Sequence, residues 1–210
     1  MRAASALLAV LLLAACAGGA PERTRHRDFD ITLPAAPQSS AAPQRRDATL
    51  RVARVQAPAW LDTRELYYEL AYVDPPTIAP YAYSRWVGPA PRLLGRLLRQ
   101  RLAAYGTWRG VLAADADAPA DAELEVRLLA MRQVFTSQTE SYAMIRVRAT
   151  LTDGQGGDVI AQKELEGRAA APSADARGGV QAFGRAAGQL AADLNRWLTS
   201  ATQGRFGASG

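Results

Sequence analysis

The sequence is poor in the residues that most catalytic centres need. Its 210 residues include one histidine, His26, and one cysteine, Cys16. A single cysteine excludes an internal disulfide, and a Ser–His or Cys–His relay needs a histidine held by a fold, whereas His26 lies in a short polar tether. Asp62 and Glu65 could act as an acid–base pair, but surface charge is the simpler interpretation. We therefore expect no catalytic residues and no enzyme activity.

Clusters of metal ligands and phosphate-binding loops are also lacking. Asp115, Asp117 and Asp121 come nearest to a metal site, but their spacing lacks the loop glycine and terminal glutamate of a calcium-binding hand, so a solvated loop is the simpler interpretation. The glycine-rich stretch 153–158, DGQGGD, is not followed by Lys-Ser/Thr and predicts a hairpin loop instead. We expect neither a metal nor a cofactor.

No apolar run in the sequence reaches the ~20 residues that a membrane-spanning helix needs. The longest one, residues 6–13, follows the positive charge of Arg2 and precedes small residues. This pattern is typical of a secretory signal peptide, which we place at residues 1–15.

The signal peptide ends in Leu-Ala-Ala-Cys, the order of a bacterial lipobox. There Cys16 becomes the first mature residue and carries acyl chains such as palmitate, which anchor the protein stably when several are present. An ordinary signal peptide with a chance cysteine nearby is the alternative. The residue after the cysteine is Ala17 rather than the aspartate that favours inner-membrane retention. We therefore expect an outer-membrane lipoprotein on the periplasmic face.

The positive charge is not concentrated in any block. The formal net charge of +5 comes almost entirely from arginines scattered over every segment. Nucleic-acid-binding proteins usually carry a basic patch or tail, and an exported lipoprotein meets little nucleic acid. We therefore expect no nucleic-acid partner.

The remaining sequence predicts one globular domain, over residues 28–203, between a tether at 16–27 and a flexible tail at 204–210. Period-two alternation predicts strands. They are expected at residues 28–33, 49–56, 65–71, 81–86 and 107–113, followed by a three-stranded antiparallel meander over residues 122–167. The stretch 34–47, rich in Pro, Ala, Ser and Gln, predicts a loop.

Two amphipathic helices are expected. Pro91 opens the first, which carries leucines on one side and Arg92, Arg96 and Arg99 on the other. The second spans about residues 175–201. With so few helices, we predict an α+β fold, in which both helices pack on one face of a mostly antiparallel or mixed sheet.

Three aromatic residues, Tyr81, Tyr83 and Trp86, precede the first of these helices. Aromatic side chains here can belong to the core or to a docking surface. We expect Trp86 to pin the helix and the tyrosines to reach outward. The arginine face suits anionic lipid head groups or an acidic protein surface. The candidate partner-binding residues are Tyr81, Tyr83, Trp86, Arg92, Arg96 and Arg99.

Taken in order, these features resemble the ABC-type transport auxiliary lipoprotein family. The resemblance runs from the lipobox at Cys16 through an early strand and the pattern Pro-x-Trp-Leu-Asp at residues 58–62. It continues through the aromatic segment 81–86 and the start of the meander, and ends with the helix that contains Trp197. No single motif is strong, but the ordered set covers most of the chain.

The resemblance implies a non-enzymatic subunit of an intermembrane lipid transport system. Such a subunit would dock an envelope-spanning MCE-domain protein, served by an ABC transporter complex, at the outer membrane, and so support membrane integrity. A periplasmic carrier that binds lipid itself and an envelope structural or assembly lipoprotein are the alternatives. A homo-oligomer is compatible with the sequence but is not demanded by it.

Overall fold

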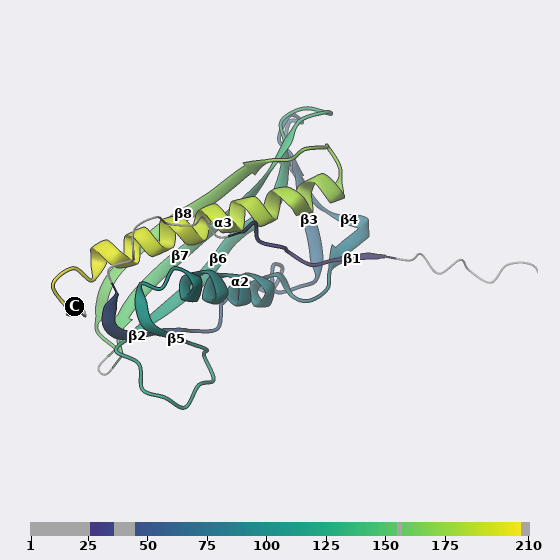
Figure 1. The fold of residues 1–210 in the computed structure, drawn as a ribbon. Coiled ribbons are helices and arrows are strands. Elements are labelled where there is room, and N and C mark those ends of the chain that lie inside the picture. The colour runs from purple at the N-terminus through teal and green to yellow at the C-terminus, as the bar shows by residue number, and fades with distance from the viewer. Residues whose placement is uncertain (1–25, 36–44, 155–156, 207–210) are drawn as a thin grey trace, which may run out of the picture.

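A computed structural model describes residues 26–35, 45–154 and 157–206 of the protein. Cys16 and the predicted signal peptide lie outside the described residues. In the described part the chain forms one sheet and two helices (Figure 1). The strands are β1 (Arg27–Phe29), β2 (Arg46–Val52), β3 (Glu65–Leu70), β4 (Thr77–Trp86), β5 (Trp108–Leu112), β6 (Ala122–Phe135), β7 (Ser141–Asp153) and β8 (Val159–Ala170); the helices are α2 (Ala90–Ala104) and α3 (Ala176–Ala201).

The sheet is organised around β6, its longest strand. Along one edge β6 pairs with β7, and β7 pairs with β8, which confirms the antiparallel meander. The other edge of β6 is shared: its first residues pair in parallel with β2, and its last residues pair in parallel with β3. From β2 the sheet continues to β5, and from β3 to β4 and β1. The sheet therefore forks into two branches.

Both helices cover the same face of the sheet (Figure 1). Helix α2 buries Leu94, Leu98 and Leu102, and α3 buries Phe183 and Leu190, all less than 2% exposed. The opposite face carries ion pairs between neighbouring strands, such as Arg146–Glu166 and Arg148–Glu164. A sheet with one face packed and one face solvated alternates apolar and polar residues, as the sequence does. The predicted single α+β domain is confirmed.

The first strand is shorter than predicted. Pairing with β4 ends at Phe29, although burial alternates as far as Leu33, with Ile31 2% exposed. Beyond Phe29 the chain leaves the sheet and crosses the helices. A Cβ on Gly184 of α3 would lie only 2.2 Å from the carbonyl oxygen of Thr32, and Arg101 of α2 donates to the carbonyl oxygen of Pro34. The alternation of buried and exposed residues beyond Phe29 therefore arises from packing against the helices rather than from strand pairing.

Two other strand boundaries differ from the prediction. Strand β2 begins at Arg46 and ends at Val52, so residues 53–56 lie outside it and bond to β6 singly, as when the Gln56 backbone N–H donates to the carbonyl of Val126. Strand β4 begins at Thr77 and runs through Pro80. Proline is tolerated there because β4 lies near the edge of the sheet.

Candidate functional site

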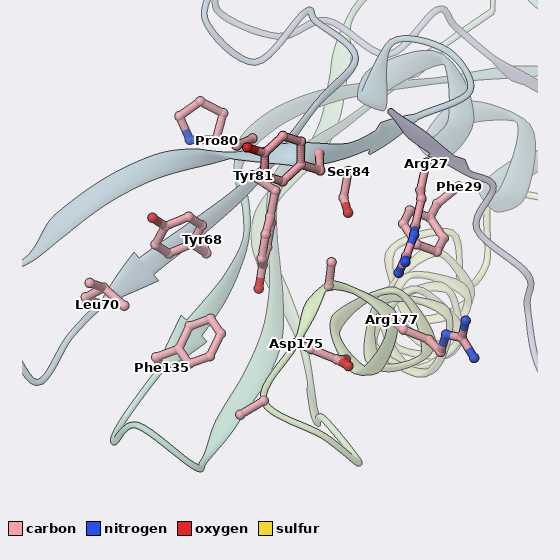
Figure 2. A pocket seen from close by; sticks show the side chains of 14 residues that line it. Arg27, Phe29, Tyr68, Leu70, Pro80, Tyr81, Ser84, Phe135, Asp175 and Arg177 are labelled. Atoms are coloured by element: carbon pink, nitrogen blue, oxygen red, sulfur yellow. The ribbon is translucent and has the colours of Figure 1, made fainter. Parts of the chain in front are cut away.

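A large hollow of the described structure lies where the β3–β4 branch meets the start of α3. It is a cavity of about 1070 Å³ (Figure 2). Its walls come from segments distant in sequence: β1, β3, β4, the end of β6 and the first residues of α3. The sheet fork creates this space, because β3 and β4 extend past the part of the sheet that α2 covers. The lining residues are Arg27, Phe29, Tyr68, Leu70, Pro80, Tyr81, Ala82, Tyr83, Ser84, Phe135, Ala174, Asp175, Ala176 and Arg177.

Aromatic rings form much of the cavity wall. Tyr68 and Tyr81 have ring centroids 4.9 Å apart, and Phe135 meets Tyr68 edge to face at 6.0 Å. Figure 2 shows these three rings converging. Offset and edge-to-face contacts stabilise aromatic groups beyond their buried area, so this wall presents a firm apolar surface.

Tyr81 is fixed by a polar chain that continues into the core. Its hydroxyl donates to Oε1 of Gln133 (2.9 Å), and Nε2 of Gln133 donates to Oγ of Ser141 (2.8 Å). Gln133 is fully buried. Burial raises the pKa of Tyr81 above its ordinary value, so the phenol stays protonated and acts as the donor. The ring is therefore positioned as a wall rather than as a nucleophile or base.

A glycine pair at the start of α3 makes room for this chain. A Cβ on Gly179 would lie 2.0 Å from Oε1 of Gln133, and one on Gly178 would lie 2.2 Å from the carbonyl oxygen of Ser173. Asp175 caps the helix: its carboxylate accepts from the Gly178 backbone N–H (2.7 Å) and from the Ser173 hydroxyl (2.8 Å). These bonds hold the pKa of Asp175 below its usual value. Close backbone approach thus brings the helix start to the cavity.

The rim of the cavity carries two arginines that form no ion pair with the described residues, Arg27 and Arg177. The neighbouring Arg64 and Arg85 are different, because both bind Asp28 at 2.8 Å. Hydrogen bonding from Arg85 lowers the pKa of Asp28. The carboxylate of Asp175 lines the same cavity, so the lining carries two positive charges and one negative charge, and the net charge at the mouth is positive.

Exposed apolar side chains gather around the same branch of the sheet. Of the seven large apolar residues that are exposed in the described chain, all but Val159 lie between Trp60 and Val87. Tyr83, at the cavity rim, is 64% exposed. The others in this branch are Trp60, Tyr72, Val73, Ile78 and Val87. Such clustering is typical of an interaction surface, whereas single exposed apolar residues need no explanation.

The predicted arginine face lies at a separate hollow. Arg92, Arg96 and Arg99 line a shallow depression of about 340 Å³ between α2 and residues 52–55, which Asp115 also borders. Arg96 is paired with Asp30 at 2.6 Å. No ion pair of Arg92 or Arg99 is present in the described structure.

The structure separates the six candidate residues into three groups. Tyr83 is exposed at the cavity, and Tyr81 lines it while bonding inward to Gln133. Trp86 is 1% exposed and packs edge to face on Phe183 at 5.4 Å, so it lies in the core rather than at a docking surface. The three arginines of α2 line the other hollow.

Sequence reasoning missed several residues of the cavity. Tyr68 lies in β3 and Phe135 is the last residue of β6, and the parallel pairing of these two strands brings them together. Gln133 and Arg177 had no visible partner in the sequence. The glycine pair at 178–179 was a usable signal, because adjacent glycines inside a helix cost stability unless close packing requires them.

The other candidate residues do not form a catalytic or metal-binding arrangement within the described ranges. Asp121 accepts hydrogen bonds from the backbone and hydroxyl of Thr49, Asp115 borders the arginine hollow, and no metal-binding group of acidic, histidine or cysteine residues is present there. His26 is exposed. Among the described helices, none is long and apolar enough to cross a bilayer.

Comparison with known proteins identifies relatives in sequence and in fold. A family model described as "ABC-type transport auxiliary lipoprotein component" matches residues 30–195. No curated protein sequence matches the chain.

Two crystal structures share the fold. A Xanthomonas campestris protein assigned to the family model DUF330 superposes with a TM-score of 0.71 at 20% identity, over 84% of this chain and 97% of that one. A structure titled as an uncharacterized protein gives 0.63 at 15% identity, over 83% and 99%. At these identities the likeness shows the architecture alone.

Proposed function

The chain belongs to the ABC-type transport auxiliary lipoprotein family, and from this we propose that it docks an envelope-spanning MCE-domain protein at the outer membrane. In this role it is the non-enzymatic, lipid-anchored end of an intermembrane lipid transport system powered by an ABC transporter. Cys16 carries the anchor, and Ala17 favours the outer membrane over the inner one. The family supports a transport role in the envelope; the partner and the membrane are our proposal.

The observation that carries the proposal is the exposed apolar surface of the β3–β4 branch. Tyr83 is exposed at the rim of an aromatic-lined cavity, and Ile78 in the same strand and Tyr72 in the turn between β3 and β4 are also exposed. Exposed aromatic residues beside a pocket are typical of the anchors that dominate binding energy in protein interfaces. Tyr83 is therefore the central residue of the proposed docking face.

A lipid carrier is the second candidate, and the cavity itself favours it. Its volume and aromatic walls fall in the range of small-molecule sites, and Arg27 and Arg177 suit a phosphate group. The cavity is open along the sheet edge, however, and polar groups line much of it (Figure 2). This openness favours docking over storage of an acyl chain.

In-cell photo-crosslinking tests the proposal. A photoreactive residue replaces Tyr83 in the full chain, with Cys16 left in place for lipidation. The same residue at Val159 is the matched control, because Val159 is 65% exposed and Tyr83 is 64% exposed, while Val159 lies in β8 at the other edge of the sheet. We expect a crosslink to an MCE-domain protein from position 83 only.

Other outcomes redirect the proposal. Crosslinks from position 83 to phospholipid alone would favour the carrier. Equal crosslinks from both positions would show that neither surface is specific. No crosslink at position 83, in a folded protein, would remove the docking face.

A further inference from the structure

The cavity adjoins a stretch of sheet edge that has no partner strand among the described residues. Within residues 26–35, 45–154 and 157–206, β4 pairs on its outer side with β1 alone, through Ser84, Arg85 and Trp86. Among the described residues, the edge from Thr77 to Tyr83 is bordered by β3 alone. Unpaired edges with apolar side chains are ready sites for another strand, which proteins normally cover or protect with charge.

Strand β1 shows that this edge accepts a strand. The Val87 backbone N–H donates to the carbonyl of Phe29 at 2.8 Å across it, whereas the Trp86 N–H donates inward to Arg64 at 2.7 Å. Successive peptide groups point to opposite edges of a regular strand, so the N–H of Arg85, two residues before Val87 and within the part of β4 that pairs with β1, also points outward. The edge that β1 begins to cover is thus continuous with the edge beside the cavity.

The cavity lies where a side chain of such an added strand would enter. It is lined by the edge residues 80–84 on one side and by the start of α3 on the other. Alternate residues of a strand point to opposite faces, so an added segment would send every second side chain toward Tyr68, Tyr81 and Phe135. Their rings suit an aromatic or aliphatic side chain.

The rim charges select the chemistry of the segment. Arg27 and Arg177 lack ion-pair partners in the described structure, so an acidic residue beside the apolar one would pair with them. The chain's own residues before Arg27 include Arg23 and Arg25, whose charge has the wrong sign for this position.

We propose that the β4 edge binds an extended, acidic segment of the transport partner by strand addition, with one apolar side chain of the segment seated in the aromatic cavity. Main-chain hydrogen bonds to the edge supply affinity, and the cavity with its two arginines supplies specificity. This inference rests on the proposed docking function for the identity of the partner, but the binding mode is tested without it.

The test uses a phage-displayed library of random 12-residue peptides, selected against the full chain extracted in detergent. Selected peptides are then titrated against the wild type and three variants. Tyr83→Pro removes a main-chain N–H from the strand that forms the edge. Arg177→Glu reverses a rim charge, and it suits folding because acidic residues stabilise the first turn of a helix. Arg205→Glu, an exposed change beyond the end of α3, is the matched charge control.

We expect selected peptides to combine acidic residues with an aromatic or aliphatic residue. Binding should weaken at least tenfold with Arg177→Glu and with Tyr83→Pro, and less than twofold with Arg205→Glu. Backbone amide signals of residues 77–83 should shift in NMR spectra when peptide is added. If Tyr83→Pro fails to fold, two measurements still test the proposal. These are the difference in peptide affinity between Arg177→Glu and Arg205→Glu, and the shifts of the backbone amide signals.

Three results would overturn the proposal. They are the absence of selected peptides, equal loss of binding in Arg177→Glu and Arg205→Glu, and binding of phosphatidylglycerol vesicles or of a second copy of the chain at this edge in place of peptide.

The two proposals can fail separately. If crosslinking from Tyr83 captures the MCE-domain protein and any of these results occurs, the docking function is supported and strand addition is wrong. If peptides bind at the edge but crosslinking captures no such protein, strand addition stands and the docking partner is wrong.

Discussion

Tyr83 and Trp86 are three residues apart in β4 but differ fully in environment. Trp86 is 1% exposed against Phe183, and Tyr83 is 64% exposed at the cavity rim. We predict that Trp86→Ala lowers the free energy of unfolding by about 3–5 kcal/mol, as is usual for buried aromatic residues. Tyr83→Ala should change it by less than about 0.5 kcal/mol. Urea unfolding followed by circular dichroism measures both, and similar losses would contradict the docking role of Tyr83.

The glycines of α3 also differ in environment: Gly179 is in close contact with Gln133, whereas Gly188 has space for a side chain. We predict that Gly179→Ala destabilises the protein by about 1–3 kcal/mol, because the new methyl group displaces Gln133 and leaves buried polar groups unpaired. Gly188→Ala is the control in the same helix: its Cβ would meet only Cδ of Pro34, at 3.8 Å. It should stabilise the protein by about 0.5–1 kcal/mol. Thermal unfolding of both variants checks the difference, and a stabilised Gly179→Ala would contradict the buried polar chain.

At the scale of single residues, the sequence predicted which side chains of the helices face the core. It did not predict most of the residues that form the cavity. Phe183, Leu190 and Leu194 recur at steps of three and four residues, which indicates one buried helix face, and all three are buried in the structure. Burial of Gln133 could not be predicted, because its partner Tyr81 is 52 positions away and comes from another branch of the sheet. Contacts of that kind depend on strand order, which local patterns do not encode.

Helix α3 begins at a cap that should respond to acid. Asp175 accepts from the Gly178 backbone N–H, and its pKa is lowered. A carboxylate with a depressed pKa in the folded state stabilises the protein above its unfolded pKa of ~3.9, and the gain is lost as the pH falls further, through the folded pKa. We predict that Asp175→Ala costs about 1 kcal/mol at neutral pH.

The pH dependence provides the check on this prediction. As the pH falls through the lowered folded-state pKa of Asp175, the wild-type carboxyl becomes protonated, so the difference in unfolding free energy between wild type and Asp175→Ala should shrink. Urea unfolding at neutral and acidic pH measures it. The same difference at both pH values would show that the side chain acts by packing rather than by charge.

Element types were predicted more reliably than element ends. Both helices and the meander were found, since each has a long periodic pattern. The early strand was placed too far along the chain because Ile31 and Leu33 alternate in burial while lying against helices. Strand β4 was started too late because Pro80 looked like a break. A strand at a sheet edge can contain proline, but edge position is a property of the whole sheet.

Over the whole molecule, positive charge is neutralised on the open sheet face and less so on α2. Arg146 and Arg148 pair with Glu166 and Glu164, whereas Arg92 and Arg99 form no ion pair in the described structure. We predict that Arg92→Gln with Arg99→Gln weakens binding of the Cys16→Ser chain to phosphatidylglycerol vesicles about 30-fold, at ~1 kcal/mol per arginine.

The matched control is Arg146→Gln with Arg148→Gln. These two arginines are already paired, so their loss should change vesicle binding less than about threefold. Binding of the wild type should also weaken as salt is raised from low to physiological strength, because exposed charges are screened. Vesicle co-sedimentation measures all three. Equal effects of the two double variants would indicate that net charge, rather than the α2 face, drives binding.

One contact joins the start of the sheet to the end of the chain. Arg46, the first residue of β2, donates to the carbonyl oxygens of Thr199 and Thr202 at the end of α3. Thr202 lies 156 positions after Arg46, and β2 is flanked by β5 and β6, both of which follow it in sequence. A chain synthesised from its N-terminus thus presents β2 before its neighbours are available. Such non-local pairing delays folding, so the native structure forms only after α3 has been delivered, and until then the polypeptide needs protection from aggregation and proteolysis.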